Sequence, residues 1–219
     1  MSNFAIARRG LLVAAGAAFA GMGFAGGVAL GRSAPPVVTE PVPHGAGEAW
    51  AALMRGNARW SGGRAGHPHQ DIARLHEVAG HQAPYAVVVS CIDSRVPPEV
   101  VFDAGVGDLM VVRTAAHTLD PLVKAAVEYG PQHLGVPLVV VLGHQRCGAV
   151  TAASEAIRGG ARLHGDLQRV VEELRPSYRG DLTGMIQAHT RACVRRLGGV
   201  GVTVVGAYYS LDTGVVRRI

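Results

Sequence analysis

The sequence contains few cysteines. Only three of its 219 residues are cysteine, namely Cys91, Cys147 and Cys193. This small, odd number excludes the even-numbered disulfide framework on which small secreted domains depend. We therefore expect thiols that bind a metal or are buried as small apolar side chains.

Charged and aromatic residues are also scarce, at 17% and 5% of the chain. The formal net charge of +5 comes largely from the first 35 residues, which hold Arg8, Arg9 and Arg32 and no acidic residue. This leaves 18 of the 21 basic residues against all 16 acidic ones in the rest of the chain. That part has no basic run with interleaved aromatic residues, so the sequence predicts no nucleic-acid partner.

The N-terminal region has the pattern of a targeting segment. Twenty residues without a charge, 11–30, follow Arg8 and Arg9, and twelve of them are Gly or Ala. This layout is typical of an export signal, and the A-R-R-G-L-L start resembles a twin-arginine signal. An uncleaved membrane anchor is the alternative, because twenty residues just span a bilayer.

The length suits one folded domain with a tail. We expect an export signal or membrane anchor at residues 1–34, a Pro- and Gly-rich linker at 35–47 and a catalytic domain at 48–219. The protein is then exported, to the periplasm or the cell exterior, or attached to a membrane through its N-terminus.

Within the domain, four continuous apolar runs have the length of strands buried on both faces. They are Tyr85–Ser90, Leu109–Thr114, Leu138–Leu142 and Val202–Ala207. Helical patterns occupy Glu48–Arg59, Ile72–His81, Pro121–Tyr129, Ala149–Arg158, Gly165–Leu174 and Met185–Leu197. The alternation predicts an α/β fold, a mainly parallel sheet flanked by helices. Residues 208–219 read as a C-terminal hairpin that adds an edge strand.

Two predicted strands end in chemically unusual residues. The first leads into C-I-D-S-R, with Cys91, and the third into G-H-Q-R-C-G, with His144 and Cys147. Ligands gather at the carboxyl ends of parallel strands. Two thiolates and one imidazole suit Zn²⁺ and leave its fourth position open, as in catalytic zinc sites. We expect one zinc on Cys91, His144 and Cys147.

Other residues in or near these motifs can have structural roles as well as roles at the metal. Asp93 and Arg95 are expected to form an ion pair that also controls the metal, and Gly148 is expected at a turn or a helix N-terminus that aims amides at the site. Cys193, within a predicted helix, is expected to be a buried small apolar residue. His67 and His69 have no thiolate nearby and are expected in a surface loop.

With these motifs in place, residues 48–219 resemble the β-class carbonic anhydrases. C-I-D-S-R-V-P-P-E and V-L-G-H-Q-R-C-G-A-V carry the resemblance, and the closing G-A-Y-Y-S-L-D-T-G supports it. It implies zinc on the three expected ligands, a homodimer or higher even oligomer, and an Asp93 that either pairs with Arg95 or moves onto zinc as a further ligand. His117 is a departure, because the family usually has Asn there; it bears on the pocket wall or the dimer contact.

The resemblance implies reversible hydration of carbon dioxide to bicarbonate and a proton. Zinc acidifies its bound water, and the resulting hydroxide attacks CO₂, with Asp93 and Arg95 as the catalytic pair. Two alternatives stay open: a hydrolase of a related heterocumulene such as CS₂ or COS, and a zinc- or bicarbonate-binding module without turnover. The retained Asp93 and Arg95 argue against the second.

Overall fold

The structure, a computed structural model, describes residues 42–219. The expected export or anchor segment at 1–34 and the first part of the linker lie outside the described residues. The first helix begins at Ala46, two residues before the expected start of the domain. The helices are α1 Ala46–Ser61, α2 Ile72–Val78, α3 Pro98–Val101, α4 Pro121–Leu134, α5 Gly148–Gly159, α6 Leu167–Leu174 and α7 Leu182–Arg196, with single 3₁₀ turns η1 Ala115–His117 and η2 Arg175–Ser177.

The five strands form one sheet in the order β2-β1-β3-β4-β5. They are β1 Ala86–Cys91, β2 Leu109–Thr114, β3 Leu138–His144, β4 Thr203–Tyr209 and β5 Val216–Arg218. The first four are parallel, and β5 pairs antiparallel with β4 at the edge. The predicted α/β class, the four strands and the C-terminal edge-strand hairpin are confirmed.

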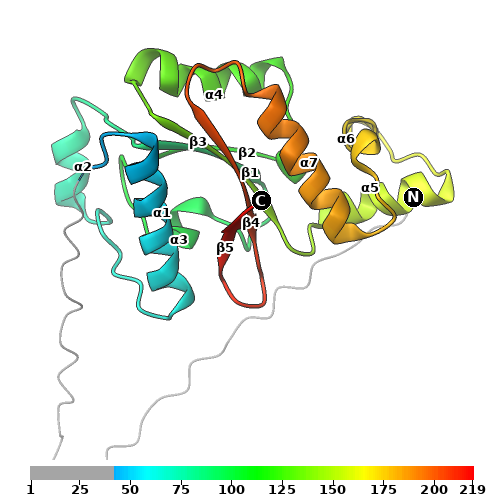
Figure 1. The fold of residues 1–219 in the computed structure, drawn as a ribbon, viewed down its shortest axis with the longest axis horizontal. Coiled ribbons are helices and arrows are strands. Elements are labelled where there is room, and N and C mark those ends of the chain that lie inside the picture. The colour runs from blue at the N-terminus through cyan, green and yellow to red at the C-terminus, as the bar shows by residue number, and fades with distance from the viewer. Residues whose placement is uncertain (1–41) are drawn as a thin grey trace, which may run out of the picture. The chain divides into compact units, whose positions relative to one another are not determined.

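Helices cover both faces of the sheet (Figure 1). Alternate residues of the central strands pack against opposite layers of these helices. Val88 and Val140 belong to a core shared with α1 and α3, whereas Val87 and Val139 belong to a core shared with α4 and α7. Every residue of β1 and β3 is buried. In a strand covered on both faces, the odd and the even positions are both buried and must both be apolar. This explains the continuous apolar runs in the sequence.

Local signals set several helix boundaries. The side chain of Asp120 accepts a hydrogen bond from the Val123 amide and caps α4, whose first residue is a proline, and Gly135 ends the helix in the left-handed conformation. The helix runs five residues beyond its predicted end, because it continues through Pro131. Proline within a helix removes one backbone donor, so local pattern alone favours an earlier end.

The turn after β2 has an unusual backbone. Ala116 and His117, within η1, both have positive φ angles, of 55° and 48°. Neither residue is glycine, so each carries steric strain. This turn places the Ala116 amide toward β1 and buries the His117 ring, which is 1% exposed.

Among residues 42–219, no helix combines the length and apolarity needed to cross a membrane.

Candidate metal centre

The candidate centre lies where the strand order reverses. β2 follows β1 on one side and β3 lies on the other, so the connections leave the sheet in opposite directions at the carboxyl ends of β1 and β3. In open α/β sheets this junction forms the ligand crevice. Cys91 is the last residue of β1, His144 is the last of β3, and Cys147 caps the N-terminus of α5. The fold therefore gathers the three expected ligands from sequence positions up to 56 residues apart.

The three ligand atoms form a tight, buried cluster. They lie within 4.8 Å of one another, and Cys91 Sγ is 3.8 Å from Cys147 Sγ. The side chains are almost fully enclosed. His144 Nδ1 donates to the backbone carbonyl of Gln145 at 3.0 Å, so Nε2 carries the lone pair, and this buried Nε2 has no hydrogen-bond partner. A buried lone pair beside two thiols fits a metal of the Zn²⁺ type.

The electrostatics of the thiols also fit a cation. The hydrogen bond with Cys147, with help from His144, lowers the pKa of Cys91 despite its burial. The same hydrogen bond and burial raise the pKa of Cys147 far above its ordinary value. The pair thus loses one proton readily and holds the second one tightly. A cation between the sulfur atoms would offset the repulsion between two negatively charged sulfurs, so that both cysteines could be thiolates.

Backbone amides support the cluster from two sides. The amides of Ala149 and Val150, in the first turn of α5, bond to Cys147 and lower its pKa, and the Ala116 amide donates to Cys91 Sγ at 3.4 Å. The expected helix N-terminus at Gly148 is therefore present. A Cβ at Gly148 would meet nothing within 4 Å, so crowding does not demand glycine there.

Asp93 and Arg95 form the expected ion pair at the edge of the centre. Arg95 Nε donates to Asp93 Oδ1 at 2.9 Å, Arg95 Nη2 donates to Oδ2 at 2.7 Å, and the Arg95 amide also donates to Oδ1 at 3.0 Å. These bonds, the guanidinium first, lower the pKa of Asp93 to about 2 against the effect of burial. Asp93 Oδ2 lies 4.0 Å from His144 Nε2. The carboxylate is ionised and close to the metal position, but its direction is set by Arg95.

Arg113 fixes the loop that carries this pair, a role that the sequence did not reveal. Its Nε donates to the Cys91 carbonyl at 2.9 Å and its Nη2 to the Asp93 carbonyl at 2.7 Å. The sequence did contain one indication of this role, an arginine inside an otherwise apolar predicted strand. A charged side chain in such a place needs hydrogen-bond acceptors nearby.

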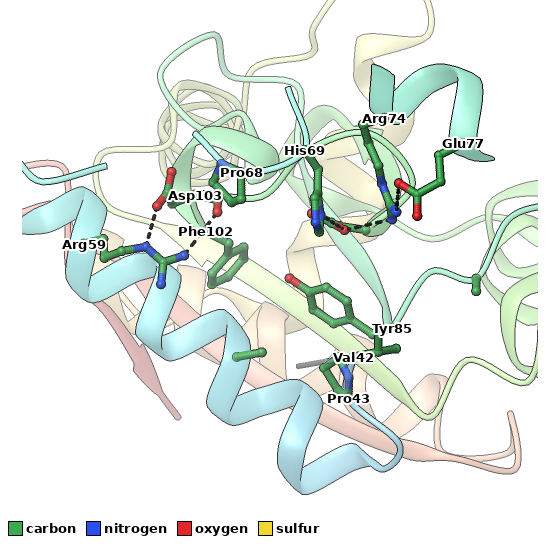
Figure 2. A pocket seen from close by; sticks show the side chains of 13 residues that line it. Val42, Pro43, Arg59, Pro68, His69, Arg74, Glu77, Tyr85, Phe102 and Asp103 are labelled. Atoms are coloured by element: carbon green, nitrogen blue, oxygen red, sulfur yellow. Dashed lines mark hydrogen bonds and ion pairs between the residues drawn. The ribbon is translucent and has the colours of Figure 1, made fainter. Parts of the chain in front are cut away.

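The predicted surface loop is confirmed and forms part of a separate pocket (Figure 2). His69 Nδ1 lies 2.8 Å from Asp108 Oδ1, and its side chain is 37% exposed. Arg59 pairs with Asp103 in the same pocket, and no ligand of the cysteine cluster lines it. The charged groups here neutralise one another, so this pocket does not compete with the cysteine cluster as the candidate centre.

Fold and site together define an α/β metalloprotein with a three-donor Cys/His/Cys centre. The sequence model of the family described as "Carbonic anhydrase" matches residues 86–198. Carbonic anhydrase 2 of Mycobacterium tuberculosis (strain ATCC 25618 / H37Rv) is 39% identical over 184 residues, which cover 76% of this chain and 89% of that protein. A carbonic anhydrase of Mycolicibacterium smegmatis is 38% identical over 187 residues, covering 77% of this chain and 91% of that protein. The chain belongs to the β-class carbonic anhydrase family.

Solved structures support the fold. A tetrameric β-carbonic anhydrase of Sordaria macrospora matches with a TM-score of 0.60 at 22% identity, over 78% of this chain and 96% of that one. The Coccomyxa β-carbonic anhydrase in complex with acetazolamide matches with a TM-score of 0.59 at 23% identity, over 76% of this chain and 84% of that one. The expected resemblance is thus confirmed.

Proposed function

We propose that the protein catalyses the reversible hydration of carbon dioxide to bicarbonate and a proton, with Zn²⁺ held by Cys91, His144 and Cys147. The observation that carries the proposal is the convergence of two thiols and an unpartnered imidazole nitrogen beside a carboxylate held by arginine. Membership of the carbonic anhydrase family supplies the substrate.

When bound, Zn²⁺ would act as a Lewis acid that lowers the pKa of a water to about 7. The residues of the chain supply the remaining requirements. The low pKa of Asp93 keeps its carboxylate ionised at neutral pH. Its Oδ2 lies next to the metal position, where it would accept a hydrogen bond from the attacking water or, if released by Arg95, compete with that water. Arg95 is the positioning partner, because its planar fork fixes the direction of that carboxylate.

The proposal predicts that Cys147→Ser loses zinc and CO₂ hydration together, because a neutral hydroxyl replaces a thiolate ligand. Stopped-flow hydration and metal analysis on the same samples test it. Cys193→Ser, a substitution of the third buried thiol, is the matched control and keeps zinc and activity. Full zinc retention in Cys147→Ser would remove the ligand assignment, whereas zinc-loaded wild-type protein that turns over COS or CS₂ but not CO₂ would favour the heterocumulene hydrolase.

We also propose that the active unit is a homodimer or a higher even oligomer. β2 is an edge strand whose residues are only half-buried within the described chain. Large apolar side chains on neighbouring segments are exposed, with Ile92 at 61% and Leu122 at 81%. An apolar strand edge of this kind is covered in a stable protein.

The association predicts a larger mass than one chain in sedimentation equilibrium. Leu122→Glu should weaken this association, because it places a charge on an apolar surface that the oligomer would bury. Arg158→Glu on α5 is the control. A wild-type protein that stays monomeric at high concentration contradicts the proposal.

The N-terminal segment is proposed to export the domain or to anchor it to a membrane. The charge-free run at 11–30 after two arginines supports this, and the described domain needs no such segment for its core. Cell fractionation tests it: we expect the protein outside the cytosol or in the membrane fraction, and wholly cytosolic full-length protein would contradict it.

A further inference from the structure

A second group of metal-ligating side chains lies in the core, behind the turn η1. It consists of His117 from η1 and of His189 and Cys193 from α7, whose ligand atoms all lie within 4.8 Å of one another. The three side chains are 1%, 1% and 0% exposed. His189 and Cys193 are four residues apart and so share one face of the helix. The expectation that Cys193 is buried is confirmed, but its neighbours are two imidazoles.

The hydrogen bonds define where the lone pair of His117 lies. Thr190 Oγ1 donates its one hydrogen to the Ile186 carbonyl at 2.9 Å. It therefore accepts from His117 Nε2, at 3.2 Å, and Nε2 carries the ring proton. The other nitrogen of His117, Nδ1, has the lone pair, is buried and has no hydrogen-bond partner. Buried polar atoms are rarely left in this state without a reason.

His189 and Cys193 also place potential metal-binding atoms close together. Cys193 Sγ lies 3.5 Å from His189 Nε2 and 3.6 Å from the His117 carbonyl, and the two imidazole rings have centroids 4.8 Å apart. Burial lowers the pKa of His189 to about 4 and that of His117 as well, so both rings are neutral ligands at neutral pH. Metal–nitrogen and metal–sulfur bonds of about 2.0–2.3 Å place donors around one ion at about 3.5–4 Å from one another. The observed spacing needs little adjustment to hold an ion.

We propose that His117, His189 and Cys193 form a second metal site, separate from the catalytic centre, that binds a monovalent soft cation, Cu⁺. Thiolate and imidazole donors suit Cu⁺. One thiolate neutralises one monovalent charge, whereas a divalent ion would leave a net positive charge in a buried apolar site. No fourth Cys, His, Asp or Glu joins the group among residues 42–219, and Cu⁺ is stable with three ligands while structural Zn²⁺ takes four.

The site adjoins the catalytic centre through two consecutive residues of η1. The Ala116 amide donates to Cys91 Sγ, and the next residue supplies the His117 ring. The His117 backbone, in the left-handed conformation, suits asparagine as well as histidine. His117→Asn therefore removes a ligand while keeping the turn, and Cys193→Val removes the thiol while filling most of its volume.

The test uses full-length, zinc-loaded protein under anaerobic conditions. Cu⁺ is added as its acetonitrile complex with bathocuproine disulfonate as the competing chelator, until the copper content is constant, and copper and zinc are then measured together. We expect one retained copper per chain with zinc unchanged, and an X-ray absorption spectrum of three-coordinate Cu⁺ with one sulfur ligand. Cys193→Val and His117→Asn should lose this copper, while zinc content and the far-ultraviolet circular dichroism spectrum stay at wild-type values. CO₂ hydration is compared with wild type for Cys193→Val, in which it should be unchanged.

Cys147→Ser is the reciprocal control: it should lose zinc and keep the copper. Three results would overturn the proposal: no copper retained against the chelator, copper that replaces zinc one for one, and equal copper retention in wild type and Cys193→Val. Binding of a second Zn²⁺ instead of Cu⁺ would overturn the assignment to a monovalent ion.

Discussion

Replacing Arg95 by lysine tests how the carboxylate beside the metal position is controlled. The guanidinium donates two of the three hydrogen bonds that Arg95 makes to Asp93, and the third comes from its backbone amide. An ammonium group lacks the two parallel N–H donors of a guanidinium. Arg95→Lys therefore keeps the backbone hydrogen bond and at most one side-chain hydrogen bond to Asp93. The freed Asp93 carboxylate, whose Oδ2 already lies 4.0 Å from His144 Nε2, then turns toward the metal position and competes with water.

The size of the effect follows from the surroundings of the pair. Removing a residue that orients a group at a metal costs roughly 10- to 100-fold in activity. The Arg95 side chain is 51% exposed, and exposed ion pairs are weakened by water, so we expect the lower end, roughly a tenfold fall in kcat/KM. Zinc content should not change, because all three expected ligands are retained.

Stopped-flow CO₂ hydration across the pH range, on samples of measured zinc content, is the assay. Asp93→Ala added to Arg95→Lys separates two causes: activity recovers if the carboxylate only blocks the metal, and does not recover if Asp93 also orients the attacking water. Unaltered turnover of Arg95→Lys at every pH, with zinc confirmed, would refute the reasoning.

Two further predictions concern stability. Asp103→Asn should destabilise the fold by about 1–3 kcal/mol at pH 7, measured by urea unfolding, because the buried carboxylate accepts hydrogen bonds from Arg59 and two backbone amides. These bonds lower the pKa of Asp103 despite its burial, so its contribution is present above the unfolded value of about 3.9 and is lost as the pH falls through the lower folded value; a difference between wild type and variant that grows in acid would contradict this. Gly130→Ala should cost about 1–3 kcal/mol, since its Cβ would lie 2.7 Å from Val87 Cγ2, whereas Gly148→Ala, which meets nothing within 4 Å, should be tolerated by the fold; equal melting temperatures of the two variants would refute the packing argument.

Much of the catalytic region could be predicted from sequence because its residues follow strands that are themselves easy to recognise. Continuous apolar runs locate β1 and β3, and the rule that ligands lie at carboxyl ends then brings Cys91 and His144 together. The Asp93 and Arg95 pair was predictable for a similar reason, since the two residues are two positions apart.

Contacts between distant segments were not predictable in this way. Arg113 reaches the carbonyls of Cys91 and Asp93 only because β2 lies beside β1. An apolar run identifies a strand but does not indicate which strand lies next to it. Cys193 was correctly expected to be buried, and the four-residue spacing from His189 was visible, but His117 joins them from 76 residues away through a turn with two left-handed residues. Such a backbone cannot be inferred for Ala and His from local propensity.

The 3.8 Å separation of Cys91 Sγ and Cys147 Sγ also determines how the protein responds to oxidants. A metal that coordinates both thiolates occupies the electron pairs that an oxidant would attack. Without it, the low pKa of Cys91 supplies a thiolate beside the thiol of Cys147. An oxidant that takes two electrons from this pair, with release of the one remaining thiol proton, would join the sulfur atoms in a disulfide and destroy the ligand set. Metal loading before exposure to an oxidising compartment therefore protects the enzyme, and a route that carries the domain across a membrane already folded would preserve that order of events.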